Sequence, residues 1–145
     1  MKKNKNRNII LFFVFYIFLQ SCTVLTSYGR NYKIALNHYN NQRYDLAVVY
    51  SIKSLEKKPN YEKSLNLYEK VVPEAINFHH DNITQFAATS GYEDALVDEY
   101  NALFDLIQAI GNANISRTYS LYVLKSYEKG YSSALQNAAE FHYQN

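Results

Sequence analysis

The sequence predicts an all-α protein, and three observations support that fold class. Only four glycines and two prolines occur among 145 residues, so few positions disfavour a helix. After residue 31 the apolar residues recur at three- and four-residue steps, which places them on one face of a helix. No long segment alternates apolar and polar residues in the manner of a strand. We therefore expect one helical domain over residues 31–145, a length that suits a single core.

A signal peptide is predicted for residues 1–21. The first eight residues carry four basic side chains and no acid, and residues 9–19 are all apolar. Eleven residues rise only about 16 Å as a helix, roughly half the hydrocarbon core of a bilayer, so a permanent membrane span is disfavoured. A basic start, a short apolar run and a small residue, Ser21, before the cleavage point are typical of an exported leader.

Cys22 is the only cysteine and directly follows this leader. The residues Leu19-Gln20-Ser21-Cys22 resemble the lipobox of bacterial lipoproteins, although Gln20 stands where a small or β-branched residue is usual. The resemblance implies that Cys22 becomes the N-terminus, diacylated on its sulfur and acylated on its new amine. Two or three acyl chains would anchor the protein to a membrane far more firmly than one. Two alternatives stay open: Cys22 is a buried or unpaired thiol, or cleavage occurs a few residues later and leaves a soluble protein.

The charge of the chain depends on this leader. Four of the fifteen basic residues lie in it, which leaves eleven against thirteen acidic residues, a formal charge of −2 after residue 21. The basic balance of the whole chain thus gives no reason to expect a nucleic-acid partner. Tyr is unusually frequent, with fifteen copies and no Trp. It suits either contacts between helices or a binding surface.

The first two helices are expected soon after the leader. Residues 22–30 are predicted to be a lipidated tether, because they show no sustained periodicity. A helix is expected from Asn31, and the polar turn at residues 40–43 ends it. A second helix is expected over residues 44–57, because its terminal lysines suit a helix C-terminus and Pro59 stops it.

The segment that contains this second helix resembles the tetratricopeptide repeat. In that family an aromatic residue opens the second helix of the repeat, Ala follows three places later, and an aromatic recurs near the middle. A small residue, Leu and a closing Pro follow. The matching residues here are Tyr44, Ala47, Tyr50, Ser54, Leu55 and Pro59. Small side chains at such places let helices approach closely. The resemblance implies irregular helical hairpins stacked as a short α-solenoid.

The pattern Tyr-x-x-small recurs along the chain, which supports a repeat interpretation. Its copies are Tyr44–Ala47, Tyr61–Ser64, Tyr92–Ala95 and Tyr131–Ala134. Gly91 and Gly130 precede two of them, where a turn between helices would need a permissive backbone. The spacing is irregular, and chance recurrence in a Tyr-rich chain is the alternative.

Further helices are expected in the second half of the chain. Residues 60–88 form one long helix or two with a kink at Pro73. Residues 92–110 are the clearest amphipathic helix. Its predicted apolar face consists of Leu96, Tyr100, Leu103, Phe104, Ile107 and Ile110. Residues 116–128 and 131–145 form a last hairpin. No stop signal precedes the final residue, so either the chain is shorter than its relatives or this helix frays.

Few residues carry a chemical signal. His79-His80-Asp81 is the only run that resembles metal ligands, but adjacent helical residues project about 100° apart and share an ion poorly. A solvated helix end, or ring packing near the proline, is the preferred interpretation. The acids between Glu93 and Glu99 are expected on a solvated helix face. We predict no metal, no cofactor and no enzymatic activity, because no nucleophile, base or phosphate-binding motif is evident.

These observations favour a lipid-anchored, non-catalytic scaffold for protein–protein interaction in the bacterial cell envelope. Its partners would be unidentified envelope proteins, bound in a groove formed by first helices of the repeats. Helix phase alone selects the candidate groove residues Tyr32, Asn37, Asn40 and Asn41. The alternative is a lipoprotein that binds a peptide or glycan in a closed pocket with aromatic walls.

Two expectations concern location and assembly. Thr23 is not the acidic residue that retains some lipoproteins at the inner membrane, so the periplasmic face of the outer membrane is predicted. Phe141 and Tyr143 lie on the terminal helix, where a further hairpin of a repeat protein would stack. Self-association or partner binding through this helix is therefore expected.

Overall fold

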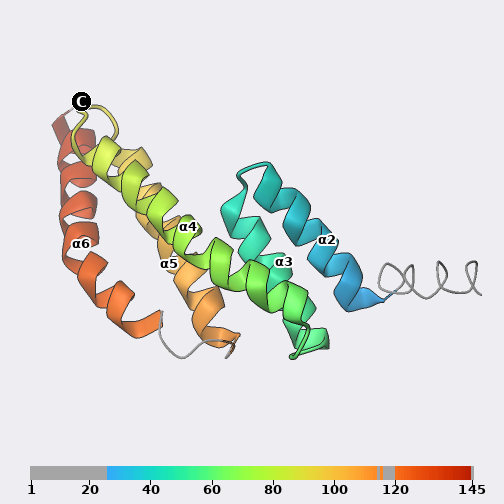
Figure 1. Cartoon of the computed structure of the whole chain (residues 1–145). Coiled ribbons are helices and arrows are strands. Elements are labelled where there is room, and N and C mark those ends of the chain that lie inside the picture. Colours follow the sequence, from blue (N-terminus) through green and yellow to red (C-terminus); the bar gives the residue numbers. More distant parts are fainter. Residues whose placement is uncertain (1–25, 114, 116–119, 145) are drawn as a thin grey trace, which may run out of the picture.

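The computed structural model describes residues 26–113, 115 and 120–144, and this part of the chain is all-α. Its five helices are α2 (Ser27–Asn40), α3 (Tyr44–Lys57), α4 (Glu62–Ala87), α5 (Glu93–Asn112) and α6 (Ser120–Gln144). Successive helices run in opposite directions, with α2 and α3 at one end of the molecule and α6 at the other (Figure 1). The predicted fold class is thus confirmed at the level of an all-helical protein.

Each helix packs chiefly on its neighbours in the sequence. The main contacts join α2 to α3, α3 to α4, α4 to α5 and α5 to α6. Two clusters of buried side chains result. The first lies between α3, α4 and the C-terminal half of α5, and its large members include Val48, Leu55, Tyr68, Val71 and Ile110. The second lies between α4, α5 and α6, and it consists of Ile83, Leu96, Tyr100, Leu103, Ile107 and Ala134.

The first hairpin begins earlier than the sequence predicts. Thr26 caps α2, because its hydroxyl accepts a hydrogen bond from the backbone N–H of Gly29 at 3.3 Å. A side-chain oxygen at this place satisfies one of the free N–H groups at a helix start. The helix therefore begins at Ser27 and includes the last four residues of the segment predicted to be a tether.

The helix α3 occupies residues 44–57, as predicted. Its small side chains hold three helices close together. Ser54 is fully buried, and its hydroxyl donates to the carbonyl of Tyr28 on α2 and accepts from the hydroxyl of Ser64 on α4, both at 2.7 Å. Ala47 is likewise fully buried in the first cluster.

The helix α4 is one continuous helix, the first of the two predicted possibilities. Pro73 lies inside it without ending it. A proline leaves the carbonyl four residues earlier without its usual N–H partner. That carbonyl belongs to Glu69, an exposed residue, where water can replace the missing bond.

The predicted last hairpin is wrong, because α6 is a single helix that runs through Gly130. The glycine serves close packing instead of a turn. A Cβ atom at Gly130 would overlap the hydroxyl of Tyr100 on α5. Tyr131 is inside the helix, where its hydroxyl donates to Oδ1 of Asn101 at 2.8 Å and its ring lies edge-on to Phe104.

The recurring Tyr-x-x-small pattern marks a helix start in three of its four copies. Tyr44 is the first residue of α3, and Tyr61 and Tyr92 directly precede α4 and α5. Tyr131 is the exception.

No helix in the described part of the chain is long and apolar enough to cross a membrane.

Candidate functional site

A buried histidine joins the three central helices. His79 lies on α4, and its side chain is 3% exposed. Its Nδ1 lies 2.6 Å from Oε1 of Glu99 on α5, and its Nε2 lies 3.0 Å from Oδ1 of Asp45 on α3. Glu99 Oε1 also accepts a hydrogen bond from Asn82 at 3.0 Å. We call His79, Asp45 and Glu99 the histidine clamp.

The electrostatics of the clamp favour the charged imidazole. Burial lowers the pKa of His79, whereas hydrogen bonds and charges from Asp45 and Glu99 raise it, and the balance lies above the ordinary value. A protonated ring has two N–H donors, one for each carboxylate. Breaking a buried pair of this kind leaves a charge without compensation. The clamp is thus suited to holding α3, α4 and α5 together.

The clamp is not arranged to hold a metal ion. The two carboxylates lie at opposite ring nitrogens and cannot converge on one cation. Over the residues that the structure describes, no group of three or more histidine, cysteine or acidic side chains forms a metal site.

Sequence reasoning missed the clamp. Neither a solvated helix end nor packing near Pro73 describes His79, and Glu99 differs from the predicted solvated acids because its side chain is only 16% exposed. The helical phase carried a signal: His79 lies four residues after Ala75 and four before Ile83, both buried. No signal in the sequence indicated that Asp45 and Glu99 contact His79, because they lie 34 and 20 residues away from it.

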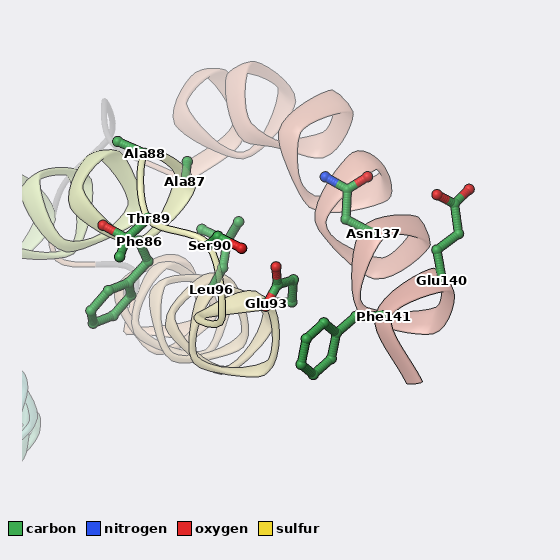
Figure 2. Close-up of a pocket in the computed structure, with 10 residues that line it drawn as sticks. All are labelled: Phe86, Ala87, Ala88, Thr89, Ser90, Glu93, Leu96, Asn137, Glu140 and Phe141. Atoms are coloured by element: carbon green, nitrogen blue, oxygen red, sulfur yellow. The ribbon is translucent and has the colours of Figure 1, made fainter. Parts of the chain in front are cut away.

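A cavity of about 490 Å³ lies between α6 and the turn that joins α4 to α5. We call it the α6 pocket. Residues 86–90 form one wall, Glu93 and Leu96 of α5 the second, and Asn137, Glu140 and Phe141 of α6 the third. Figure 2 shows the Phe141 ring reaching from α6 into the gap between α5 and α6, with Glu93 on the α5 side of that gap.

The α6 pocket combines acidic and apolar side chains and has no basic residue in its lining. Glu93 Oε1 accepts a hydrogen bond from the backbone N–H of Gly91 at 3.2 Å. Glu93 Oε2 is buried and has no hydrogen-bond partner. Glu140 accepts one hydrogen bond, from the amide of Gln136 at 3.1 Å. Neither carboxylate forms an ion pair with another described residue.

The residues predicted to line a groove are spread along α2. Tyr32 lies edge-on to the ring of Tyr61 with 5.7 Å between centroids. Asn41 and Asn37 are together at the helix end, where the side-chain amide of Asn41 donates to the Asn37 carbonyl at 2.7 Å. Asn40 is the exposed last residue of the helix. None of the four lines the α6 pocket, and Cys22 lies outside the described residues.

Comparison of the chain with protein-family models, with curated proteins and with solved structures finds no match.

Proposed function

We propose that this protein is a lipid-anchored, non-catalytic scaffold of the bacterial cell envelope that binds another protein over α6. The observation that carries the proposal is the exposed outer face of this helix. Ala134 and Ala138 are buried, whereas Leu135 and Tyr143 are 44% and 93% exposed. We call the exposed side of α6 the α6 face.

The α6 face is the open end of a row of helices. The helix α6 packs chiefly on α5, so the side turned away from α5 has no described helix over it (Figure 1). Arrays of stacked helices need a polar cap or a neighbouring chain at each end. Large apolar side chains at this end favour a neighbouring chain.

The anchor in this proposal is Cys22, on the basis of the lipobox resemblance. The start of α2 at Ser27 leaves a short connection between the acylated residue and the first helix. A chain of five residues spans at most about 18 Å. The helical domain would therefore work within a few nanometres of the membrane, which we propose to be the periplasmic face of the outer membrane.

Two features support a repeat-type scaffold in preference to a closed ligand-binding protein. The small residues at the tetratricopeptide-like places are fully buried: Ser54 links α2, α3 and α4, and Ala47 lies in the first cluster. The α6 pocket is partly open to solvent and mixes polar and apolar residues, which differs from a closed pocket with aromatic walls. A mixed surface of this kind is typical of protein interfaces.

Photo-crosslinking in the native envelope tests the proposal. A photoreactive amino acid replaces Leu135 or Tyr143 in the full chain, and the control places it at Leu46 on α3, which is 42% exposed. We expect one discrete protein adduct from each α6 position and none from Leu46. We also expect the adduct to decrease when Cys22→Ser removes the anchor. Equal labelling at all three positions, or no adduct on α6, would contradict the proposal.

A further inference from the structure

The geometry points to the α6 pocket as the binding site for an arginine side chain of the partner protein. This inference rests on the proposed function and names the chemistry that the partner presents next to the α6 face. Charge, shape and position each support it.

The first step concerns charge. Glu93 lies in the first turn of α5, whose N-terminal dipole stabilises an ionised carboxylate. Residues 86–88 at the C-terminal end of α4 also line the pocket, and this is the negative end of that helix. No Lys, Arg or His is in the lining. The pocket is therefore suited to a cation that the described part of the chain does not supply.

The second step concerns a carboxylate oxygen without a partner. Glu93 Oε2 is buried and receives no hydrogen bond, which is unfavourable for a charged group. The pocket that Glu93 lines has room for a hydrogen-bond donor next to this carboxylate. Hydrogen bonds between a guanidinium and a carboxylate are among the strongest that side chains form.

The third step concerns shape. Phe86, Leu96 and Phe141 give the pocket apolar walls. An arginine has an aliphatic stem that packs on such walls and a planar head that stacks on an aromatic ring. Phe141 and Glu93 line the same pocket from α6 and α5 (Figure 2), so a side chain bound there would have an aromatic ring and a carboxylate as neighbours.

The fourth step concerns the source of the arginine. Phe141 lines the pocket and is also 38% exposed on α6. Glu140 also lines the pocket and is an exposed residue of α6, so the pocket borders the α6 face. A protein that covers this face would place a side chain into the pocket without leaving the surface.

Peptide binding to the full chain in detergent tests the inference. The probe is fluorescein-Ala-Leu-Arg-Leu-Ala-amide, and its control carries citrulline, the uncharged isostere of arginine. Binding is followed by fluorescence anisotropy, with detergent alone as the blank. We expect the arginine peptide to bind at least tenfold more tightly than the citrulline peptide and to weaken as salt concentration rises. A second control peptide carries lysine in place of arginine. The inference is overturned if the citrulline or the lysine peptide binds as tightly as the arginine peptide, or if the arginine peptide does not bind.

Matched variants locate the binding. Glu93→Gln should weaken the arginine peptide at least tenfold, whereas Asp105→Asn, which removes an exposed charge elsewhere on α5, should leave it within twofold. Asn137→Lys should also weaken it tenfold by placing a cation at the pocket, and Ser133→Lys adds the same charge to an exposed position of α6 outside the lining. Circular dichroism verifies that each variant is folded. If Glu93→Gln unfolds, the comparison of Asn137→Lys with Ser133→Lys still tests the site.

The two proposals fail in different ways. If a crosslinked adduct forms on the α6 face but Glu93→Gln and Asn137→Lys bind the arginine peptide as the wild type does, the scaffold proposal stands and the arginine site is contradicted. If the arginine peptide binds in a charge-dependent way but no crosslinked adduct forms on the α6 face, the proposal that an envelope protein binds this face is contradicted.

Discussion

The histidine clamp places a titratable charge among three helices. His79 is almost fully buried, and both ring nitrogens have a carboxylate neighbour. The side chain of Asp45 is 46% exposed, so water screens that contact more than the contact with Glu99. Asp45 nevertheless raises the pKa of His79 more than Glu99 does.

The clamp predicts that the protein becomes less stable at alkaline pH. The pKa of His79 is higher in the folded chain than in the unfolded chain. The stabilisation is therefore complete below the unfolded pKa, near 6.5, and is lost as pH rises through the folded pKa. Urea unfolding between pH 5 and pH 9 measures it. His79→Gln should lower the free energy of unfolding by about 1–3 kcal/mol at low pH and flatten the pH dependence.

The adjacent exposed histidine is the matched control for that experiment. His80→Gln changes the same residue type one position along α4, outside the clamp. The clamp stays intact in this variant, so the part of the pH dependence that His79 contributes between pH 5 and pH 9 should persist. A variant at His79 with the slope unchanged would mean that the clamp does not titrate in this range.

The packing of α5 on α6 depends on the absence of a side chain at Gly130. Alanine normally stabilises a helix interior relative to glycine by about 1 kcal/mol. Here the added Cβ would meet the hydroxyl of Tyr100, a buried residue of the second cluster. Overpacking of a core typically costs about 1–3 kcal/mol, which exceeds the gain in helix propensity.

Gly130→Ala is therefore expected to lower the melting temperature, against its helix propensity. Tyr100→Phe removes the atom nearest the new Cβ, so the double variant should melt above Gly130→Ala alone. Thermal unfolding followed by circular dichroism measures both. A higher melting temperature of Gly130→Ala would contradict this expectation. It would mean that α5 and α6 move apart at little cost to admit the added Cβ.

The elements differ in how far the sequence predicts them. The bounds of α3 follow from local chemistry, because an aromatic start and a proline after its lysines limit it on both sides. Gly130 misleads, since a glycine that permits a turn and a glycine that permits close packing look alike without the residue opposite. The pocket and the clamp both join side chains more than fifteen positions apart, and no local pattern encodes that proximity.

At the scale of the whole molecule, the proposed role joins a membrane anchor at one end to a binding face at the other. The row of helices in Figure 1 places α2, which follows the proposed anchor, and α6 at opposite ends. A partner bound at α6 would thus be held at a distance set by the length of the row. The scaffold proposal requires both ends.

Cys22→Ser is expected to abolish labelling of the protein by a fatty-acid analogue supplied to cells. The lipobox resemblance makes the thiol the acyl acceptor, so the variant should also stay uncleaved by the lipoprotein signal peptidase. The control is Ser21→Ala, which keeps a small residue before the cysteine and should be labelled normally. Persistent labelling of Cys22→Ser in membrane extracts would rule out the anchor.

The packing of each helix on its chain neighbours has a consequence for how the protein acquires its structure. Contacts between segments close in sequence have a low loop-closure cost and favour rapid folding. The hairpin of α2 and α3 requires nothing from α6. A chain that emerges N-terminus first, from a ribosome or a translocation channel, can therefore fold progressively, each new helix adding to a platform already formed.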